Sequence, residues 1–311
     1  MKGLFKSKPR TTPADLFHHL RHLLPTPPPI PSLVKPNAEK RKVILEMRTV
    51  LYGDERLEPA EEACVKLTQE FFKEDTCCML IAALPDLDPG TRQDVTHVIA
   101  NLQRQRLNGR YLASEYLECN TSLLAMLLPG CGDSELAITH GAILRECIRH
   151  QVAAKHKSTV AEFLSKNYDW FFQEYNTLLE SPNYISRRNA VMLLGAMLLD
   201  RSNTSVMVRY VCSVDNMRVL MNLLRDSNKT IQLEAFHVFK LFPANQRKPQ
   251  EIVNVLIANR SKLIRFFSDF TFEKADEQFE SDKAEVVKEI ATLELKGQPC
   301  SALKQCEEIA C

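Results

Sequence analysis

The feature of this sequence that most restricts its possible folds is an internal repeat of about 45 residues. The segment Leu178-Leu179-Glu180-Ser181-Pro182-Asn183 aligns with Leu223-Leu224-Arg225-Asp226-Ser227-Asn228 at an offset of 45, and the same offset carries Ala190 onto Ala235. In each copy a helical pattern ends in Leu-Leu, a polar turn follows, and a longer apolar helical pattern comes next. A fainter earlier copy has Leu84, the turn over 85–90 and Val95 in the same roles.

A period of this length is typical of armadillo and HEAT repeats, in which each unit exposes an apolar face that it cannot bury alone. Stacking such units creates a continuous core and leaves a long surface lined by one set of helices. The sequence therefore predicts an all-α, armadillo/HEAT-like helical-repeat solenoid, an elongated rod with a concave groove. Such a groove is a binding surface.

The spacing of apolar residues predicts helices along nearly the whole chain, because they recur at i, i+3, i+4 and i+7. One helix covers Val43 to Leu51 and stops at Gly53. Further helices are predicted over 59–72, 75–84, 90–107, 110–128, 134–152, 158–165, 168–180, 184–199, 203–212, 215–225, 229–242, 249–257, 259–269 and 276–294. No segment alternates as a strand would.

The amino-terminal segment is predicted to differ from the repeats. Thr12-Pro13-Ala14-Asp15 reads as a helix start, with a Thr cap, Pro in the first turn and an acid three residues after the cap. The prolines over 25–31 exclude a helix and predict an extended linker, or alternatively a docking motif for proline-binding domains. We predict three parts: 1–36 as helix and linker, 37–294 as the repeat domain, and 295–311 as a disordered tail.

Composition excludes several classes of function. The chain has 311 residues, of which 45% are hydrophobic, and 40 basic against 39 acidic residues give a net charge of +1. This balance predicts neither a nucleic-acid nor a membrane-surface binder. No apolar run is long enough to span a bilayer, no signal peptide is evident, and the 10 scattered cysteines are expected to be reduced. We expect a cytoplasmic monomer.

Chemistry-bearing motifs are missing from the sequence. It contains no phosphate loop, nucleophile elbow or zinc-protease motif, so we predict no enzyme activity, no cofactor and no metal site. His18 and His22 share a helix face but lack further ligands, and the segment 86–90 places its glycine one position too early for a calcium loop. Cys147 beside Arg145 is predicted to be a core thiol rather than a reactive one.

Several continuous segments closely resemble the calcium-binding protein 39 family. They are Leu51-Tyr52-Gly53, Leu144-Arg145-Glu146-Cys147-Ile148-Arg149-His150, Leu198-Leu199-Asp200-Arg201, Met221-Asn222-Leu223-Leu224-Arg225-Asp226, Ile231-Gln232-Leu233-Glu234-Ala235-Phe236-His237-Val238-Phe239-Lys240-Leu241-Phe242 and Glu277-Gln278-Phe279. The resemblance covers about residues 40–292, and Met1 to Arg10 looks like plant members.

The resemblance implies a scaffold that binds and allosterically activates sterile-twenty-type protein kinases or related pseudokinases in intracellular signalling. In that family the groove holds the kinase, and an apolar pocket near the carboxyl end accepts a Trp-x-Phe peptide tail. Despite the family's name, no calcium site is implied. Arg188 and Arg201 match basic groove positions, and Met221 matches a position of the tail pocket. A solvated or core role is the alternative for each.

This sequence departs from the family pattern in two respects. Thr204 and Met192 stand where an aromatic and a lysine are usual in the groove, which predicts an altered partner preference. In addition, about one helical repeat is missing after His150, where 151–156 leads directly to the segment beginning at Lys157. Because each repeat contacts chiefly its neighbours, a solenoid tolerates such a loss.

Three functional readings remain open at this point. The shortened chain, an isoform or gene model, is predicted either to activate a kinase or to dock peptide tails without activation. A repeat adaptor for partners other than kinases is the second class, because the fold alone does not fix the ligand. An enzyme on a helical scaffold is the third, and it would require a deep pocket with converging titratable groups.

Overall fold

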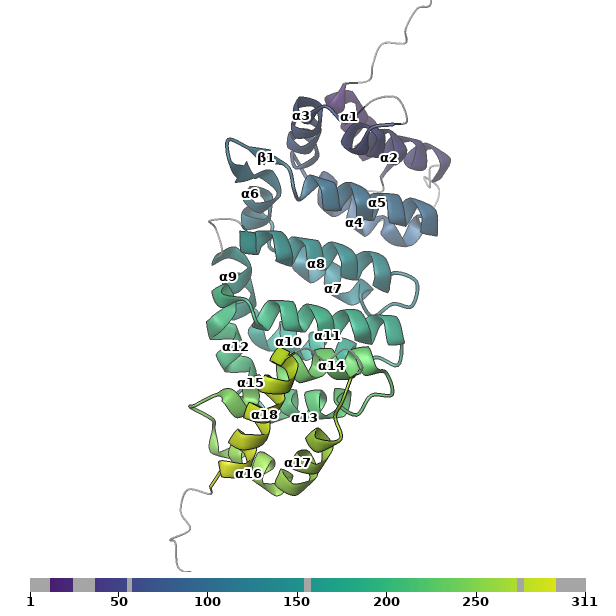
Figure 1. Cartoon of the computed structure of the whole chain (residues 1–311). Coiled ribbons are helices and arrows are strands. Elements are labelled where there is room, and N and C mark those ends of the chain that lie inside the picture. The colour runs from purple at the N-terminus through teal and green to yellow at the C-terminus, as the bar shows by residue number, and fades with distance from the viewer. Residues whose placement is uncertain (1–11, 25–36, 55–57, 154–157, 273–276, 295–311) are drawn as a thin grey trace, which may run out of the picture. The chain divides into compact units, whose positions relative to one another are not determined.

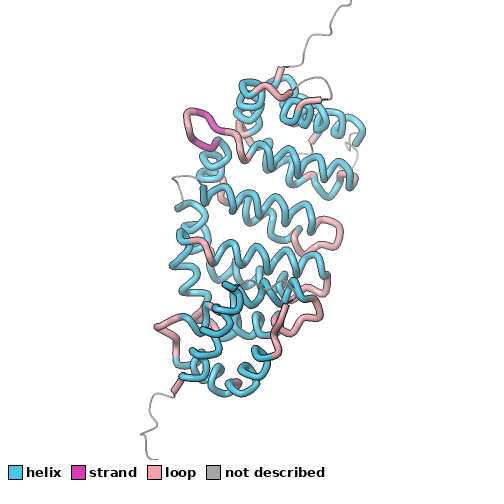
Figure 2. The backbone as a smooth tube through the Cα atoms, viewed as in Figure 1, coloured by secondary structure: helices cyan, strands magenta, loops and turns pink. Residues whose placement is uncertain are grey.

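The computed structural model describes residues 12–24, 37–54, 58–153, 158–272 and 277–294, and these ranges are almost entirely helical (Figures 1 and 2). They form two compact units, the first extending to Asn203 and the second beginning at Thr204. The boundary between the units falls within the range 37–294. The predicted linker over 25–36 and the predicted tail from 295 lie outside the described residues.

Unit 1 consists of a pair of helices followed by three triplets. The pair is α1 (Pro13–Leu23) and α2 (Asn37–Tyr52). The triplets are α3 (Glu61–Phe71), α4 (Thr76–Ala82) and α5 (Pro89–Leu102); α6 (Leu112–Cys119), α7 (Ser122–Gly130) and α8 (Ala137–Ala153); and α9 (Ser158–Lys166), α10 (Tyr168–Leu179) and α11 (Tyr184–Leu198). The short helices η2 (Leu84–Asp86) and η3 (Arg201–Asn203) complete the unit. The middle helices α4, α7 and α10 begin 46 residues apart, which confirms the predicted repeat.

The triplets stack so that equivalent helices lie in rows. Figure 1 shows α5, α8 and α11 side by side, and α2 packs on α5 to continue this row. The middle helices α4, α7 and α10 form a second row, in which α7 packs on α8 and α10 packs on α11. Apolar side chains fill the space between the rows, including the fully buried Leu80, Leu127, Leu144, Tyr175 and Leu194. Each triplet thus buries its apolar face on its neighbours, as a solenoid requires.

The same hydrogen-bonded turn recurs before the last helix of a repeat. The Asn183 side chain caps α11 by accepting from the amides of Ile185 (2.8 Å) and Ser186 (3.2 Å). Four residues after the cap, Arg187 donates back to the Ser181 carbonyl at 2.6 Å. These bonds satisfy amides that have no partner within the helix and fix the direction in which α11 leaves the turn.

The later copy of this turn has the same geometry at the offset of 45. Asn228 accepts from the amides of Thr230 (3.0 Å) and Ile231 (3.3 Å), and Gln232 donates to the Asp226 carbonyl at 2.6 Å. The earlier copy uses Asp88 as the cap of α5, with Arg92 donating to the Leu87 carbonyl at 2.8 Å. The repeat inferred from sequence therefore extends to individual side-chain hydrogen bonds.

Unit 2 continues the helical pattern. It contains α12 (Thr204–Tyr210), α13 (Val214–Leu223), α14 (Lys229–Phe239), α15 (Leu241–Ala244), α16 (Gln250–Ala258), α17 (Arg260–Ser268) and α18 (Glu277–Thr292). Its core is aromatic, with the ring of Phe236 lying 5.0 Å from that of Phe279 and 5.8 Å from that of Phe267. An ion pair between Lys240 and Asp282 also fastens α18 to the preceding helices.

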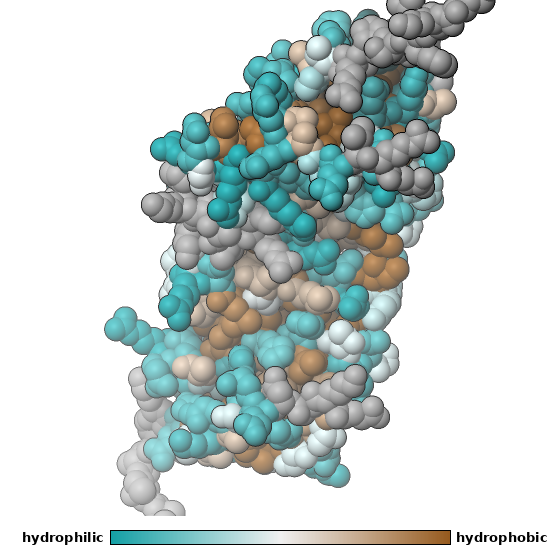
Figure 3. All heavy atoms as spheres, turned by 45° about the horizontal axis from the view of Figure 1, so that its top comes forward, coloured by the Kyte–Doolittle hydropathy of each residue, from teal (hydrophilic) through white to brown (hydrophobic). Residues whose placement is uncertain are grey.

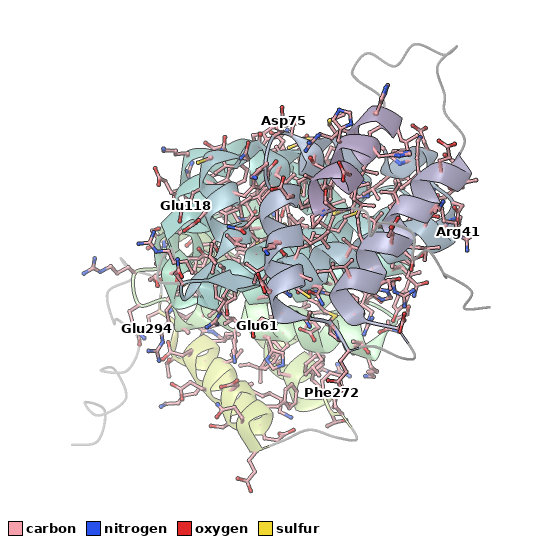
Figure 4. The ribbon with its side chains drawn as sticks, turned by 90° about the horizontal axis from the view of Figure 1, so that it is seen from above. Arg41, Glu61, Asp75, Glu118, Phe272 and Glu294 are labelled. Atoms are coloured by element: carbon pink, nitrogen blue, oxygen red, sulfur yellow. The ribbon has the colours of Figure 1, made fainter. Side chains whose placement is uncertain are left out.

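Charged side chains lie around the outside of unit 1, among some exposed hydrophobic ones. Viewed from above in Figure 4, Arg41 of α2, Asp75 and Glu118 of α6 lie on the periphery of this unit. Within the described residues, no helix is long and apolar enough to cross a membrane.

Two local predictions at helix ends are confirmed. The Thr12 side chain caps α1 by accepting from the Asp15 amide at 3.2 Å, and the Asp15 carboxylate accepts in return from the Thr12 amide at 3.4 Å. Gly53 follows the last residue of α2 with φ of 76°, a backbone conformation that glycine adopts without steric cost.

Two predictions of continuous structure are wrong. The helix predicted over 90–107 ends at Leu102, and the helix predicted over 110–128 begins only at Leu112. Between them lies a small antiparallel hairpin, β1 (Arg106–Leu107) paired with β2 (Arg110–Tyr111). Asn108 and Gly109 at its tip have φ of 51° and 79°, the pair of positive values that a two-residue hairpin turn requires.

The predicted helix over 110–128 is moreover divided into α6 and α7. Asn120 lies between them with φ of −128° and ψ of 49°, and its side-chain amide donates to the Tyr116 carbonyl at 2.9 Å. Asparagine competes with the helical backbone in this way, so it ends α6. The helix predicted over 229–242 is similarly divided into α14 and α15 around Lys240.

The predicted site of the lost repeat lies between α8 and α9. Residues 154–157 are outside the described ranges. Ala137, Gly141 and Leu144 of α8 face Asn189, Ala190 and Leu193 of α11. They leave a cavity of only about 10 Å³, which is room for at most one water molecule. We call this contact between α8 and α11 the seam. The two helices therefore pack closely there.

We predict that Gly141→Ala stabilises the protein by about 0.5–1 kcal/mol. A Cβ atom at this position in α8 would lie 3.9 Å from Asn189, an ordinary contact distance, and alanine loses less entropy on helix formation than glycine. Urea unfolding monitored by circular dichroism measures the change. Gly130→Ala is the matched control, because its Cβ would lie 2.2 Å from the His140 ring and should destabilise. Equal effects of both substitutions would contradict this account of the seam.

We also predict that stability decreases in mild acid because of His140. Burial lowers the pKa of this histidine below its usual 6.5, so in mild acid the unfolded chain binds a proton that the native state does not. The contribution of His140 is fully present above about pH 6.5 and is lost as the pH falls below that value. Urea unfolding at about pH 7.5 and about pH 5.5 should show this difference. His140→Gln should flatten the pH dependence, and an unchanged slope would exclude His140 as its source.

Candidate functional site

The three residues predicted to bind partners lie in two different units. Arg188 and Arg201 belong to unit 1, and Met221 belongs to unit 2. The structure therefore presents two candidate surfaces. One is the outer face of the helix row in unit 1, and the other is a pocket in unit 2.

Met221 lines an open pocket between α13 and α16 with a volume of about 450 Å³. One side comes from Arg218, Met221 and Asn222, which share a face of α13, and from Arg225 in the turn directly after that helix. The other side comes from Asn254, Val255, Ala258 and Asn259 at the end of α16. The volume falls within the range of small-ligand sites. Met221, Val255 and Ala258 provide apolar contact for an inserted side chain.

Polar side chains hold the rim of this pocket in place. Arg225 donates from Nη2 to the Asn222 side chain at 2.9 Å and from Nε to the Met221 carbonyl at 3.3 Å. Arg218 pairs with Asp215 at 3.1 Å, and Asn259 donates to the Val255 carbonyl at 2.9 Å. The pocket therefore combines an apolar floor with a rim that carries two cationic groups. It suits an apolar side chain from a peptide that also carries negative charge.

Arg188 lies on the outer face of α11 in a half-buried position. The structure shows no ion pair or hydrogen bond from its guanidinium to any described residue. Its neighbour Arg187, in contrast, donates to the Ser181 carbonyl and belongs to the turn. Arg188, which the sequence resemblance singles out, therefore makes no ion pair or hydrogen bond with a described residue that would stabilise the fold.

The α2 and α5 part of the same row is held together by polar contacts. Arg48 of α2 pairs with Asp94 of α5 at 2.8 Å, and the Tyr52 hydroxyl donates to the His97 carbonyl at 2.9 Å. Asn101 donates to the Leu51 carbonyl at 3.2 Å. These groups are therefore satisfied by contacts within the unit. Figure 3 shows hydrophobic residues reaching the surface in separate patches among hydrophilic ones.

Arg201 lies away from Arg188 on unit 1. It is exposed and begins η3, after the end of α11 at Leu198. Ten residues separate Arg188 from that helix end, a rise of about 15 Å at 1.5 Å per residue. The two arginines therefore do not converge on one point.

The two positions that depart from the family pattern are both accessible. Met192 is half-buried on α11, and Thr204 is exposed at the start of α12. Because Met192 lies one turn after Arg188, an uncharged side chain stands beside that arginine.

Other candidate residues have structural roles. Asp88, from the segment compared with a calcium loop, caps α5, and hydrogen bonds from the Thr91 hydroxyl and amide lower its pKa. Cys147 is 1% exposed, and burial raises its pKa to about 12, which confirms a core thiol. Among the described residues, no three His, Cys, Asp or Glu side chains are grouped to hold a metal ion.

Sequence reasoning missed several residues of these surfaces. Arg218 and Arg225 could have been found, because they are spaced from Met221 in the sequence as residues on one helix face are. Asn254 and Ala258 could not, since they are contributed by a helix about 35 residues further along the chain whose docking is a tertiary property.

These features define a class: an armadillo-like helical-repeat scaffold with two candidate binding surfaces. Solved structures agree on the fold. A designed armadillo repeat protein superimposes with a TM-score of 0.53 over 89% of this chain and 99% of the designed one, at 13% identity.

The Mo25-like family model matches residues 3–156 and 152–294. A putative MO25-like protein from Arabidopsis thaliana is 49% identical over 95% of this chain and 99% of its own length. Calcium-binding protein 39-like from Homo sapiens is 36% identical over 83% of this chain and 88% of its own length. The chain belongs to the Mo25-like family, which confirms the resemblance drawn from its sequence.

The comparisons also bear on the missing repeat. The family model matches in two parts that meet at 152–156, where the sequence predicted the loss. The alignment with the Arabidopsis relative extends over 341 positions, although this chain has 311 residues. The relative therefore contains residues that have no counterpart here. This chain is a plant-like member of the family that lacks about one helical repeat.

Proposed function

We propose that this protein is a non-catalytic scaffold that binds and allosterically activates a sterile-twenty-type serine/threonine kinase or pseudokinase in the cytoplasm. The observation that carries the proposal is the pocket around Met221. This pocket is open, is lined partly by apolar residues and lies between α13 and α16. The resemblance to the family implies that the equivalent pocket accepts a Trp-x-Phe peptide tail. In this proposal the Trp-x-Phe tail of the partner binds the pocket and anchors the kinase, and the kinase itself contacts the helix row in unit 1.

Activation by such a scaffold requires no chemistry on the scaffold. A protein kinase is active when one mobile helix places its glutamate against the catalytic lysine. A partner that binds this arrangement more tightly than others shifts the population toward it. Arg188 and Arg201 are the residues we assign to this contact, since both are accessible on unit 1 and neither maintains the turn that Arg187 forms.

A second candidate function is docking of the peptide tail without activation. The observation that favours it is the break of the family match at 152–156, because a lost repeat shortens the helix row. The pocket around Met221 belongs to unit 2 and is independent of that break. Binding of the tail and activation of the kinase are therefore separable in this chain.

We predict that the purified protein binds a labelled peptide ending in Trp-x-Phe, and that Met221→Glu weakens binding about 30-fold or more. The substitution places a charge on the apolar floor of the pocket, which is costly to desolvate. Fluorescence anisotropy measures the affinity. Met126→Glu is the matched control, because Met126 is 39% exposed on α7 and lies in the other unit. A well-folded protein that does not bind this peptide would favour an adaptor for partners other than kinases.

We further predict that the protein stimulates a sterile-twenty-type kinase carrying that tail. Arg188→Ala and Arg201→Ala should each reduce the stimulation about tenfold, as expected for loss of charge-assisted contacts, and should leave binding of the tail peptide unchanged. Initial rates of substrate phosphorylation provide the measurement, with Arg110→Ala on the hairpin as the control. Peptide binding without any stimulation would establish the docking function instead.

A further inference from the structure

The seam between α8 and α11 places two arginines on neighbouring helices. Gly141 of α8 faces Asn189 of α11, where an added Cβ atom would lie 3.9 Å from that side chain. Arg145 follows Gly141 by about one turn, and Arg188 directly precedes Asn189. Both arginines are half-buried. Figure 1 shows the two helices side by side.

The charge of these arginines is not compensated within the described structure. Neither Arg145 nor Arg188 makes an ion pair or hydrogen bond to a described residue. The only acidic residues in α5, α8 and α11 are Asp94 and Glu146. Asp94 pairs with Arg48 at 2.8 Å, and Glu146 pairs with Arg104 at 3.8 Å. Two partly desolvated cations therefore remain without an anion, although buried charges are normally paired.

Aliphatic side chains border the same surface. Ile138 on α8 is 60% exposed, and Ile185 on α11 is 42% exposed. Ile138 precedes Arg145 by seven residues and Ile185 precedes Arg188 by three, so each isoleucine shares a helix face with its arginine. Exposed isoleucines beside unpaired arginines fit a ligand that alternates apolar and negatively charged groups.

We propose that Arg145 and Arg188, bordered by Ile138 and Ile185, form a binding site for an acidic, aliphatic segment of a partner protein in extended conformation. The guanidinium groups bind carboxylates of the segment, with the fork geometry that arginine and carboxylate share. The isoleucines contact the aliphatic side chains between these carboxylates. An extended strand is favoured because its alternating side chains present two kinds of group at short spacing.

The adjacency of these arginines is a property of this shortened chain. The family model matches in two parts that meet at 152–156, so Arg145 lies in the first part and Arg188 in the second. In relatives that contain the additional residues, a further repeat separates the two segments. The inference rests on the proposed function, because it names the chemistry of a second segment of the same partner. It adds a site other than the pocket around Met221.

The test is a fluorescence anisotropy titration of the full chain with a labelled octapeptide in which Glu alternates with Val. Binding is expected at low salt and should weaken as the ionic strength rises, since the contacts are charged. Arg145→Ala and Arg188→Ala should each weaken it about tenfold, and Arg145→Lys should retain part of the affinity. Arg110→Ala, which removes a charge from the hairpin of the same unit, should have no effect.

Several outcomes would overturn this inference. The first is an affinity for the acidic peptide that neither alanine substitution changes, and the second is equal binding of a peptide with Lys in place of Glu. The third is clearly tighter binding of a peptide with phosphoserine in place of Glu, which would assign the site to phosphopeptides. Thermal melting confirms that each variant is folded. The Trp-x-Phe peptide is titrated on the same preparations. For the unsubstituted protein, absence of binding by the acidic peptide alone contradicts this site, whereas absence of binding by the Trp-x-Phe peptide alone contradicts the proposed function.

Discussion

The architecture of this protein depends on one hydrogen-bonded turn that recurs before the last helix of a repeat. A short polar side chain, Asp88, Asn183 or Asn228, caps the helix, and the residue four positions later donates back into the turn. These bonds satisfy backbone groups that would otherwise be unpaired between two apolar helices. They also fix the angle between the helices, so that each repeat presents its apolar side to the next. The caps and the buried leucines therefore support the same structure.

Because the turns are local, a repeat can be lost without loss of the fold. The partners of Asn183 and Arg187 lie within six residues along the chain, so the turn forms whatever precedes it. Loss of a repeat does require that α8 packs against α11, its new neighbour. Small residues meet there, Ala137 and Gly141 on one side and Ala190 on the other, and the remaining cavity is about 10 Å³. Close packing at the seam is the condition under which nearest-neighbour stacking tolerates a missing unit.

Features that depend on local chemistry could be predicted from the sequence, and features that depend on helix docking could not. The repeat, the cap at Thr12 and the helix stop at Gly53 follow from residue types at fixed spacings. The hairpin also has a local sequence signal, the Asn108-Gly109 turn pair. Its strands, however, are only two residues long, which is too short for an alternation of apolar and polar residues to be recognised. For the candidate sites, Met221 was found through resemblance alone. The facing wall from α16, and the fact that Arg188 has no ion-pair partner among the described residues, are evident only from the three-dimensional structure.

The internal fit and the outer surface respond differently to the loss of a repeat. Inside, most residues that meet at the seam are apolar, and one apolar pair can replace another at little cost in stability if the total volume is conserved. Outside, each helix carries its own charged residues, and a new neighbour changes which charges lie together. Arg145 of α8 and Arg188 of α11 lie on neighbouring helices, and neither has an acidic partner among the described residues. Loss of a repeat thus preserves the fold while it changes which charges the outer face presents, because packing depends on volume and the surface charge depends on which helices lie together.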